Sequence, residues 1–368
     1  MVRHSRRQFL RSGALGVAAL LAGCGPGQTA PSSAPAVASS SGGAPASKPA
    51  SSAAASVSAP PKPAASAAST AAKPSGLSFS IAWGSPGGFA VPLWLADATN
   101  AFSAAGVTAK VTYIESSAAV SALIARDVDA ILLSAAPVIT ADLNGHADLV
   151  FPASISNWPV FALYGPKSIQ TAADVKGKVV ASDRPGTPTD FGARLLLGKL
   201  GLKPSDVKIL PVGGSVQVLS ALISGQAQAG AMAPPASFQA EDKGFHQLTN
   251  IYNVPYQGVG VVMLRSRLDQ LAPATLPFLK GLRQGILGYN AQPDLAMRLL
   301  SQYSKETDAS ILKRTYEFYK TQAPFQPDLK PTLEGIQSMI AFLAESIPAA
   351  KNAKAAQFVD SRFLGQIS

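Results

Sequence analysis

Beyond residue 77, short apolar runs alternate with longer segments in which apolar residues recur every three or four positions. The short runs predict strands and the longer segments predict helices. A first series contains predicted strands at 77–83, 107–114 and 130–133 and helices at 92–104, 118–125 and 137–143. A second series contains strands at 178–182, 207–211 and 229–232 and helices at 190–200 and 216–224. This alternation predicts mostly parallel sheets with helices on both faces.

After about residue 265 the pattern becomes helical throughout. The spacing predicts helices at 276–289, 294–303, 309–321 and 332–346. In the last of these, Ile336, Met339, Ile340 and Leu343 fall on one face, which we expect to be buried.

The two strand–helix series repeat one another at a single offset of 99 residues. At this offset Ser121–Ile124 falls on Ser220–Ile223, Ala130 on Ala229, Ser116 on Ser215, and Pro86-Gly87 on Pro185-Gly186. One offset kept at four sites indicates two similar α/β lobes. Ligands of open α/β sheets bind beyond the carboxyl ends of strands, at helix N-termini. The matched loops therefore predict a ligand cleft between the lobes.

Residues 1–23 have the pattern of an export signal. Ser5-Arg6-Arg7-Gln8-Phe9-Leu10-Arg11 resembles a twin-arginine motif, and Leu21-Ala22-Gly23-Cys24 resembles a bacterial lipobox. The apolar run from 13 to 23 is too short for a membrane anchor helix, which needs about 20 residues. A plain secretory signal is disfavoured because Cys24, the single cysteine of the chain, stands where a lipobox requires it. We expect lipidation at Cys24, which would tether the protein to a membrane.

Residues 24–76 predict a disordered tether. From residue 25 this segment consists almost entirely of Ala, Ser, Pro, Gly and Thr, with Val37 and Val57 as its large aliphatic residues. Such a composition cannot bury enough apolar surface to offset the entropy of ordering. A glycosylated, mucin-like stalk is the alternative and would have the same mechanical role.

The net charge of +10 overstates the charge of the folded region. Of 31 basic residues, four lie in 1–23 and three in 24–76, whereas all 21 acidic residues follow residue 76, so the remainder carries a net +3. This value is too small to favour nucleic acid as a partner. The histidines are His4, His146 and His246. With so few ligands, we expect neither a metal site nor a cofactor.

Several short stretches occur in an order that is typical of one protein family. They are 174–180 (DVKGKVV), 185–187 (PGT), 200–207 (LGLKPSDV), 221–225 (ALISG) and, in the first series, 122–130 (ALIARDVDA). Through these motifs, residues 77–345 resemble the solute-binding proteins of ABC importers, in the SsuA/THI5-like (NMT1) group that includes nitrate, sulfonate, taurine and thiamine-precursor binders. Family members often have Gly at the position of Arg126 and Asp at that of Gln228. The cysteine-rich motif of the thiamine-pyrimidine synthases is absent, which argues against the enzyme branch.

The resemblance implies the two-lobed type II fold of periplasmic binding proteins, with the ligand cleft between the lobes. Residues 158–165 and 256–264 would be crossovers between the lobes. The first lobe would comprise 77–165 and 251–368, including the C-terminal helices, and the second lobe 166–250.

In such a protein the lobes rotate about the crossovers and enclose the ligand. The implied role is capture of a small organic solute or anion by an exported, lipid-anchored monomer. The binder would stand at the outer face of the cytoplasmic membrane or in the periplasm, and it would deliver the solute to an ABC permease and its ATPase.

In the first lobe, the candidate ligand contacts lie in the matched loops. Ser85 and Gly87 follow the first strand, and Ser134 follows strand 130–133. Ser116 and Ser117 begin a helix, where hydroxyl and backbone N–H groups can hold an anion or an amide oxygen. Simple capping of that helix is an equally good interpretation of the two serines.

In the second lobe, Arg184, Thr187 and Thr189 precede or begin a helix. Arg184 could bind a carboxylate, sulfonate or phosphonate, or it could form a salt bridge with Asp183 or Asp190. Thr187 and Thr189 could cap the helix or contact the ligand.

Two tryptophans complete the candidates. Trp83 ends the first strand and Trp158 begins a crossover, where either ring could stack on a ligand or pack in the core. Phe89 and Met232 are candidates for the pocket wall or the core.

Two other function classes stay open at this point. A ligand-sensing subunit of a membrane receptor would have the same sequence features as a transport protein. A periplasmic enzyme would need a nucleophile–base pair or a metal cluster, and neither His146 nor His246 lies in a recognisable motif.

Overall fold

The computed structural model describes residues 76–145 and 147–367. The proposed signal peptide, Cys24 and the proposed tether lie outside the described residues, as does His146.

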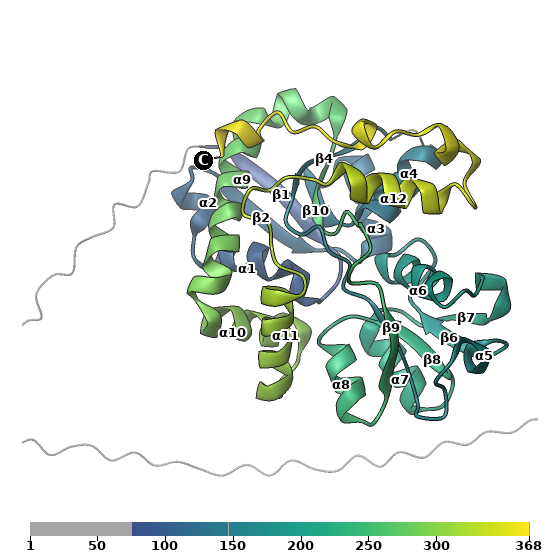
Figure 1. Ribbon diagram of the computed structural model, residues 1–368. Helices are drawn as coiled ribbons and strands as arrows, with labels where there is room; N and C mark the ends of the chain where they lie inside the picture. The colour runs from purple at the N-terminus through teal and green to yellow at the C-terminus, as the bar shows by residue number, and fades with distance from the viewer. Residues whose placement is uncertain (1–75, 146, 368) are drawn as a thin grey trace, which may run out of the picture. The chain divides into compact units, whose positions relative to one another are not determined.

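The described residues form two five-stranded sheets, which are drawn with their helices in Figure 1. The first sheet has the order β2 (Thr108–Tyr113), β1 (Ser78–Trp83), β3 (Ala130–Leu133), β10 (Gly260–Leu264) and β4 (Leu149–Ser154). The second has the order β7 (Lys208–Pro211), β6 (Val179–Ser182), β8 (Ala229–Met232), β5 (Ala162–Gly165) and β9 (His246–Asn250). In each sheet one strand, β10 or β5, is antiparallel to its neighbours.

The second sheet repeats the first at the predicted offset. β8 begins and ends 99 residues after β3, and β6 and β7 occupy the places of β1 and β2. The antiparallel strands are exchanged: β5 follows the first series but lies in the second sheet, and β10 follows the second series but lies in the first. The chain therefore crosses between the sheets twice, at 155–161 between β4 and β5 and at 251–259 between β9 and β10. These connections overlap the predicted crossovers 158–165 and 256–264, which also include β5 and β10.

Helices cover both faces of the first sheet. These helices are α1 (Val91–Ala98), α2 (Ala101–Ala104), α3 (Ser116–Ala125), α4 (Ala135–Gly145), α9 (Leu268–Ala291), α10 (Pro293–Ser304), α11 (Ala309–Thr321) and α12 (Leu333–Leu343). Alternate residues of β1 enter different cores, because successive side chains of a strand point to opposite faces. Ile81 packs in the core that includes α1 and α9, and Ala82 packs in the core that includes α3, α4 and α12.

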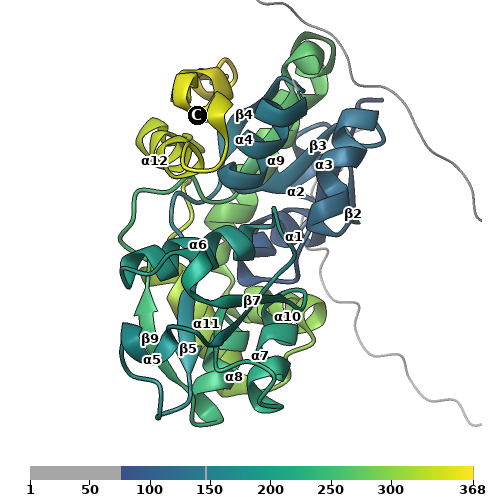
Figure 2. The same cartoon turned by 90° about the vertical axis from the view of Figure 1, so that its right-hand side faces the viewer.

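The second sheet is covered in the same way (Figure 2). Its helices are α5 (Ala172–Val175), α6 (Pro188–Lys199), α7 (Ser215–Ile223) and α8 (Ala236–Asp242). Leu163 of β5 packs with Leu196 and Leu197 of α6, whereas Tyr164 packs with α7 and α8 on the opposite face. We call each sheet with the helices that cover it a lobe.

Several elements differ from the prediction or were missed by it, among them the short helices α5 and α8, which were not predicted. The predicted helix 92–104 is interrupted, because Asn100 adopts a left-handed conformation with φ of 56° and separates α1 from α2. The strands β4 and β9 were not predicted. Both are edge strands, with Pro152 inside β4 and a largely polar sequence in β9. An edge strand tolerates proline and polar residues, so its pattern is weak.

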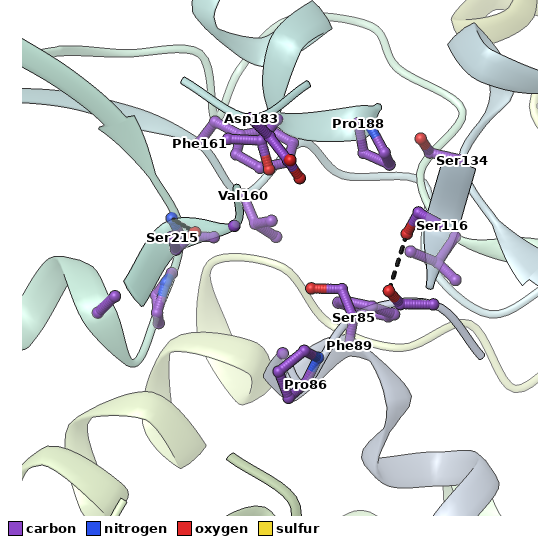
Figure 3. Close-up of a pocket in the computed structure, with 18 of the residues that line it drawn as sticks. Ser85, Pro86, Phe89, Ser116, Ser134, Val160, Phe161, Asp183, Pro188 and Ser215 are labelled. Atoms are coloured by element: carbon purple, nitrogen blue, oxygen red, sulfur yellow. Dashed lines mark hydrogen bonds between the residues drawn. The ribbon is translucent and has the colours of Figure 1, made fainter. Parts of the chain in front are cut away.

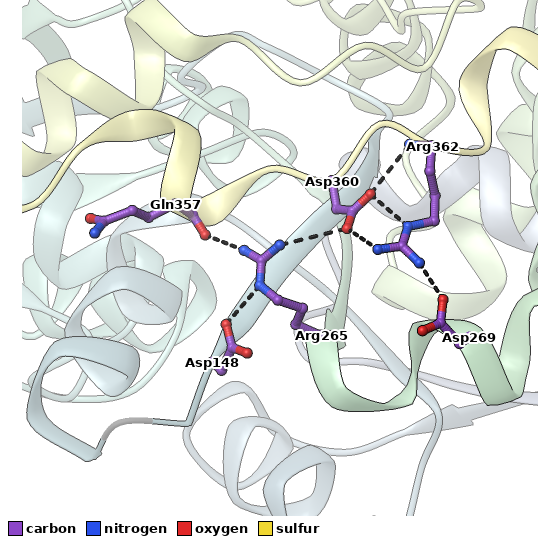
Figure 4. Close-up of polar contacts among 6 residues, drawn as sticks. All are labelled: Asp148, Arg265, Asp269, Gln357, Asp360 and Arg362. Atoms are coloured by element: carbon purple, nitrogen blue, oxygen red, sulfur yellow. Dashed lines mark hydrogen bonds and ion pairs between the residues drawn. The ribbon is translucent and has the colours of Figure 1, made fainter.

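The C-terminal segment is fastened to the first lobe by a cluster of ion pairs (Figure 4). Arg265 contacts Asp148 at 2.8 Å and also reaches Asp360. Arg362 pairs with Asp360 at 2.8 Å and with Asp269. Arg265 and Arg362 share the Asp360 carboxylate. Together the four ion pairs hold the last turns of the chain beside β4 and the start of α9.

Candidate functional site

A cavity of about 440 Å³ lies where the loops at the carboxyl ends of strands from both sheets converge. The first lobe contributes 84–87 after β1, Tyr113 at the end of β2 with Glu115 and Ser116 after it, and Ser134 after β3. The second lobe contributes 183–184 after β6, 212–217 after β7 and 233–236 after β8. Helix N-termini follow most of these loops, so polar backbone groups and hydroxyls face the cavity, as Figure 3 shows.

Seven of the predicted contact residues line this cavity. They are Ser85, Gly87, Ser116, Ser134, Trp158, Arg184 and Thr189. Trp83 and Thr187 do not line it, and the position of the Ser117 side chain lies outside what the structure describes. Met232 is completely buried in the core of the second lobe, whereas Phe89 lines the cavity.

Trp83 lies behind the cavity wall. It is 7% exposed, and its ring packs against Trp94, Tyr113 and Tyr303. Tyr113, which does line the cavity, rests on the Trp83 ring with a centroid distance of 4.8 Å. Aromatic packing therefore gives Trp83 a supporting role.

Thr187 has a capping role. Its hydroxyl accepts a hydrogen bond from the backbone N–H of Asp190 and donates one to the Arg184 carbonyl at 2.9 Å. As N-cap of α6 it has both hydroxyl functions engaged. Thr189, two residues further on, faces the cavity.

Arg184 pairs with neither of the partners considered from the sequence. Its Nη1 lies 3.3 Å from Oε2 of Glu115 in the other lobe. Asp190 is bound instead by Arg194, one helical turn further along α6, at 3.1 Å. Glu115 therefore balances the charge of Arg184 beside the cavity. The sequence pattern did not single out Glu115.

Ser116 joins two loops of the first lobe. Its hydroxyl donates to the carbonyl of Gly84 at 3.0 Å, and its backbone N–H donates to the same oxygen at 3.2 Å. A Cβ atom at position 84 would lie 2.5 Å from the Ser116 hydroxyl oxygen, so this close approach requires glycine. Ser116 thus holds the loop after β1 and lines the cavity at the same time.

Three hydroxyl groups that line the cavity are buried without a well-formed hydrogen bond among the described residues. They belong to Ser134, Tyr256 and Tyr319. Burial raises the pKa of Tyr256 to about 12, and the nearby Ser134 hydroxyl opposes that increase. A buried polar group without a partner costs about 1–3 kcal/mol, so a ligand that supplied partners would recover that free energy.

Asp183 was missed as a candidate, although it adjoins Arg184. It follows β6 directly, and in Figure 3 its carboxylate points into the cavity beside Phe161. Desolvation by burial raises the pKa of this carboxyl, and the negative charge of Glu115 adds to the increase. The backbone N–H of Arg184 donates to Asp183 at 2.7 Å and acts in the opposite direction.

Other wall residues had a weak sequence signal or none. Ser215 could have been nominated, since it lies 99 residues after Ser116. Tyr256 lies in the second crossover, and Tyr319 comes from α11, far along the chain from the repeated loops. Gly88 admits the Tyr319 ring, because a Cβ atom at position 88 would lie 2.3 Å from it.

Within residues 76–145 and 147–367, no group of three or more His, Cys, Asp or Glu side chains is placed to hold a metal ion. No helix in this same part of the chain combines the length and the apolar character needed to span a bilayer.

Comparison with known proteins places this geometry in a family. The profile described as NMT1/THI5 like matches residues 90–295, more than half of the chain. No curated protein matches the sequence significantly.

Solved structures share the fold at low identity. A protein from Bordetella bronchiseptica RB50 superposes with a TM-score of 0.70 and 18% identity, covering 80% of this chain and 98% of that one. The alkanesulfonate-binding protein SsuA from Xanthomonas axonopodis pv. citri, bound to MOPS, gives 0.65 and 19%, covering 79% and 99%. The nitrate-binding protein NrtA from Synechocystis PCC 6803 gives 0.61 and 14%, covering 79% and 88%.

SsuA and NrtA are periplasmic binding proteins, and the two mixed sheets flanked by helices are the type II arrangement. The chain belongs to the NMT1/THI5-like family and has its two-lobed α/β fold.

Proposed function

We propose that this chain is an extracytoplasmic, lipid-anchored solute-binding protein that captures a small organic solute or anion and delivers it to an ABC permease and its ATPase. The observation that carries the proposal is the cavity at the meeting of the two lobes, with the buried hydroxyls of Ser134, Tyr256 and Tyr319 facing it. Family and fold support the same class, since both are those of solute-binding proteins rather than of enzymes.

Lobe closure would work through the two crossovers. The first lobe was expected to extend to residue 165, but β5 (Ala162–Gly165) lies in the second sheet, so we assign 77–161 and 251–368 to the first lobe and 162–250 to the second. At the crossovers the chain segments approach closely: a Cβ atom on Gly258 would lie 2.5 Å from the Ser156 carbonyl oxygen. The buried amide of Gln257 bridges this region, donating to the Ser154 hydroxyl at 2.7 Å and accepting from the Thr332 N–H at 2.8 Å.

Three polar contacts away from the crossovers join the lobes in this conformation. One is the Arg184–Glu115 pair beside the cavity. Another connects α11 with α8, where Arg314 pairs with Glu241 and with Asp242. In the third, the side-chain amide of Gln239 in α8 donates a hydrogen bond to Glu306. All three contacts would separate if the lobes opened, so they favour the closed arrangement.

The export signal and Cys24 support the location. A lipid on Cys24 followed by the 24–76 tether would let the binding domain reach a permease while staying attached to the membrane.

A thermal-shift screen tests the binding function. The panel comprises sulfonates, nitrate, pyrimidines and aromatic carboxylates, applied to the purified protein. A ligand present at 100 times its Kd stabilises the folded state by about 2.7 kcal/mol, which is a clear shift in Tm. A panel without any shift would contradict the ligand classes that the family suggests.

A further inference from the structure

The proposed solute-binding function leaves the chemistry of the solute open, and the charges that face the cavity bear on it. The charged residues in the wall are Glu115, Asp183, Arg184 and Lys305. Arg184 is paired with Glu115, and its side chain is 57% exposed. Lys305 is exposed at the C-terminal end of α10. Neither cation is buried in the cavity.

The donors of Ser116, at the start of α3, are already engaged. The Ser116 N–H and hydroxyl both donate to the Gly84 carbonyl. The Ser215 hydroxyl, at the equivalent place in the second lobe, accepts a hydrogen bond from the backbone N–H of Ala233 at 3.1 Å and keeps its own O–H for a ligand. An anion at Ser116 would therefore compete with contacts that shape the loop after β1.

Asp183 is in the opposite situation. It is partly buried, its carboxylate faces the cavity, and among the described residues it takes part in no ion pair. Its backbone contact with Arg184 N–H engages one carboxylate oxygen. A partly buried carboxylate that forms no ion pair favours a ligand that supplies a cationic group.

Asp183 also breaks the internal repeat. The residue 99 positions earlier is Gly84, where the close approach of Ser116 excludes any side chain. A charged side chain thus stands at the carboxyl end of β6, whereas the equivalent place after β1 has no side chain. The two halves of the cavity wall are therefore chemically different, and Asp183 is the carboxylate of the wall that forms no ion pair among the described residues, since Glu115 pairs with Arg184.

The remainder of the wall is largely apolar. Phe89, Val160, Phe161 and Pro188 line the cavity around Asp183 and across from it, as Figure 3 shows. Such a wall suits a ligand with an apolar or aromatic body and gives little to a small, fully hydrated ion such as nitrate.

We propose that the solute carries a positively charged nitrogen group, an ammonium or amidinium, which Asp183 binds, on an apolar or aromatic body that packs against Phe89 and Phe161. This inference rests on the proposed solute-binding function and narrows its ligand class.

A matched series of small aromatic compounds tests the proposal by calorimetry and thermal shift. The cationic probes are benzylamine and benzamidine, the neutral probe is benzyl alcohol, and the anionic probes are benzoate and benzenesulfonate. We expect the cations to bind at least tenfold more tightly than the neutral and anionic probes. Preferred binding of benzoate or benzenesulfonate would overturn the inference while supporting solute binding. Absence of binding by all five would overturn the inference, and only a failure of the wider screen as well would count against the proposed function.

The variant Asp183→Asn adds a second test, in which the direction of the change in affinity decides. Removing the carboxylate should weaken benzylamine and benzamidine at least tenfold and leave benzyl alcohol unchanged. The control Asp127→Asn alters an exposed carboxylate outside the cavity wall and should change none of the affinities. Tighter cation binding by Asp183→Asn would overturn the proposal.

If the variant is unstable, the same question is answered on the unaltered protein by lowering the pH. Protonation of Asp183 should then weaken the cations, whereas unchanged cation affinity down to about pH 4 would overturn the assignment. Glu115, Arg184, Tyr113 and Lys305 also face this region, so benzyl alcohol, whose affinity should not change over the same pH range, serves as the control.

Discussion

Nη1 of Arg184 lies 3.3 Å from Oε2 of Glu115, and this contact joins the loop after β6 to the loop after β2. The two loops belong to different lobes but stand beside the same cavity. The sequence left open whether Arg184 binds an anion or forms a salt bridge, and in the structure it pairs with a residue of the other lobe.

Removing this contact should loosen closure without abolishing binding. We expect Arg184→Ala and Glu115→Gln each to weaken the affinity for whichever solute binds in the screen by a few fold, because partly exposed ion pairs contribute about 0–1 kcal/mol. The double variant should lose little more than either single variant, as expected for two residues acting through one contact. Complete loss of binding in Arg184→Ala alone would show instead that Arg184 holds an anionic ligand directly.

The contact between α8 and α11 makes a second prediction. Arg314 lies 2.7 Å from Asp242, also pairs with Glu241, and stacks over the Phe238 ring at 4.5 Å. Arg314→Ala should shift the ligand-free protein towards an open form, seen as an increased radius of gyration in small-angle X-ray scattering. Arg314→Lys keeps the charge but loses the planar fork, so we expect an intermediate effect. Identical scattering from all three proteins would mean that this contact does not influence closure.

Packing of α1 against α9 depends on a glycine. A Cβ atom at Gly285 would lie 2.0 Å from the Pro92 carbonyl oxygen and 2.9 Å from Ala96. Gly285→Ala should therefore lower the free energy of unfolding by on the order of 1–3 kcal/mol in urea denaturation. Gly198 provides the matched control, because it lies within α6 and a Cβ atom at this position would meet nothing within 4 Å. Gly198→Ala should raise the free energy of unfolding by at most about 1 kcal/mol.

Stability should depend on pH differently at two aspartates. Burial raises the pKa of Asp183, so its ionised form is disfavoured in the folded state. Its contribution to stability is present below the ordinary carboxyl pKa of about 3.9 and is lost as the pH rises through the higher folded value. Asp183→Asn should therefore increase Tm at pH 7 relative to the unaltered protein, and the difference should vanish near pH 3.

Asp174 provides the comparison of opposite sign. Hydrogen bonds from the N–H groups of Gln170 and Thr171 lower its pKa, so its contribution is present at neutral pH and is lost as the pH falls. Asp174→Asn should decrease Tm at pH 7. Equal effects of the two variants would contradict the assigned environments.

The lipid anchor is tested by Cys24→Ser. We expect the unaltered protein in the membrane fraction, with a mature N-terminus at Cys24 that carries diacylglycerol, as mass spectrometry would show. The serine variant should be recovered unlipidated. A separate change of Arg6 and Arg7 to lysine tests the export route, and retention in the cytoplasm is the outcome expected for a twin-arginine signal.

The strand–helix order was readable from the sequence because buried strands and amphipathic helices have strong, local patterns. β3 was predicted at its observed limits, and the 99-residue offset located its counterpart β8. The edge strands β4 and β9 escaped prediction because an edge strand accepts Pro152 in the buried β4 and a largely polar sequence in β9. Seven of ten candidate contacts line the cavity, since helix starts after parallel strands meet at one edge of each sheet.

The sequence by itself therefore determined the family, the repeated α/β halves and the loops that line the cavity. The tertiary structure decided which side chains in those loops reach the cavity. Trp83 packs in the core, where three aromatic rings surround it, and Thr187 caps a helix. Tyr319 lines the cavity from a helix far along the chain, and Glu115 forms the ion pair with Arg184. Such contacts join residues distant in sequence, and local patterns do not encode which of them meet.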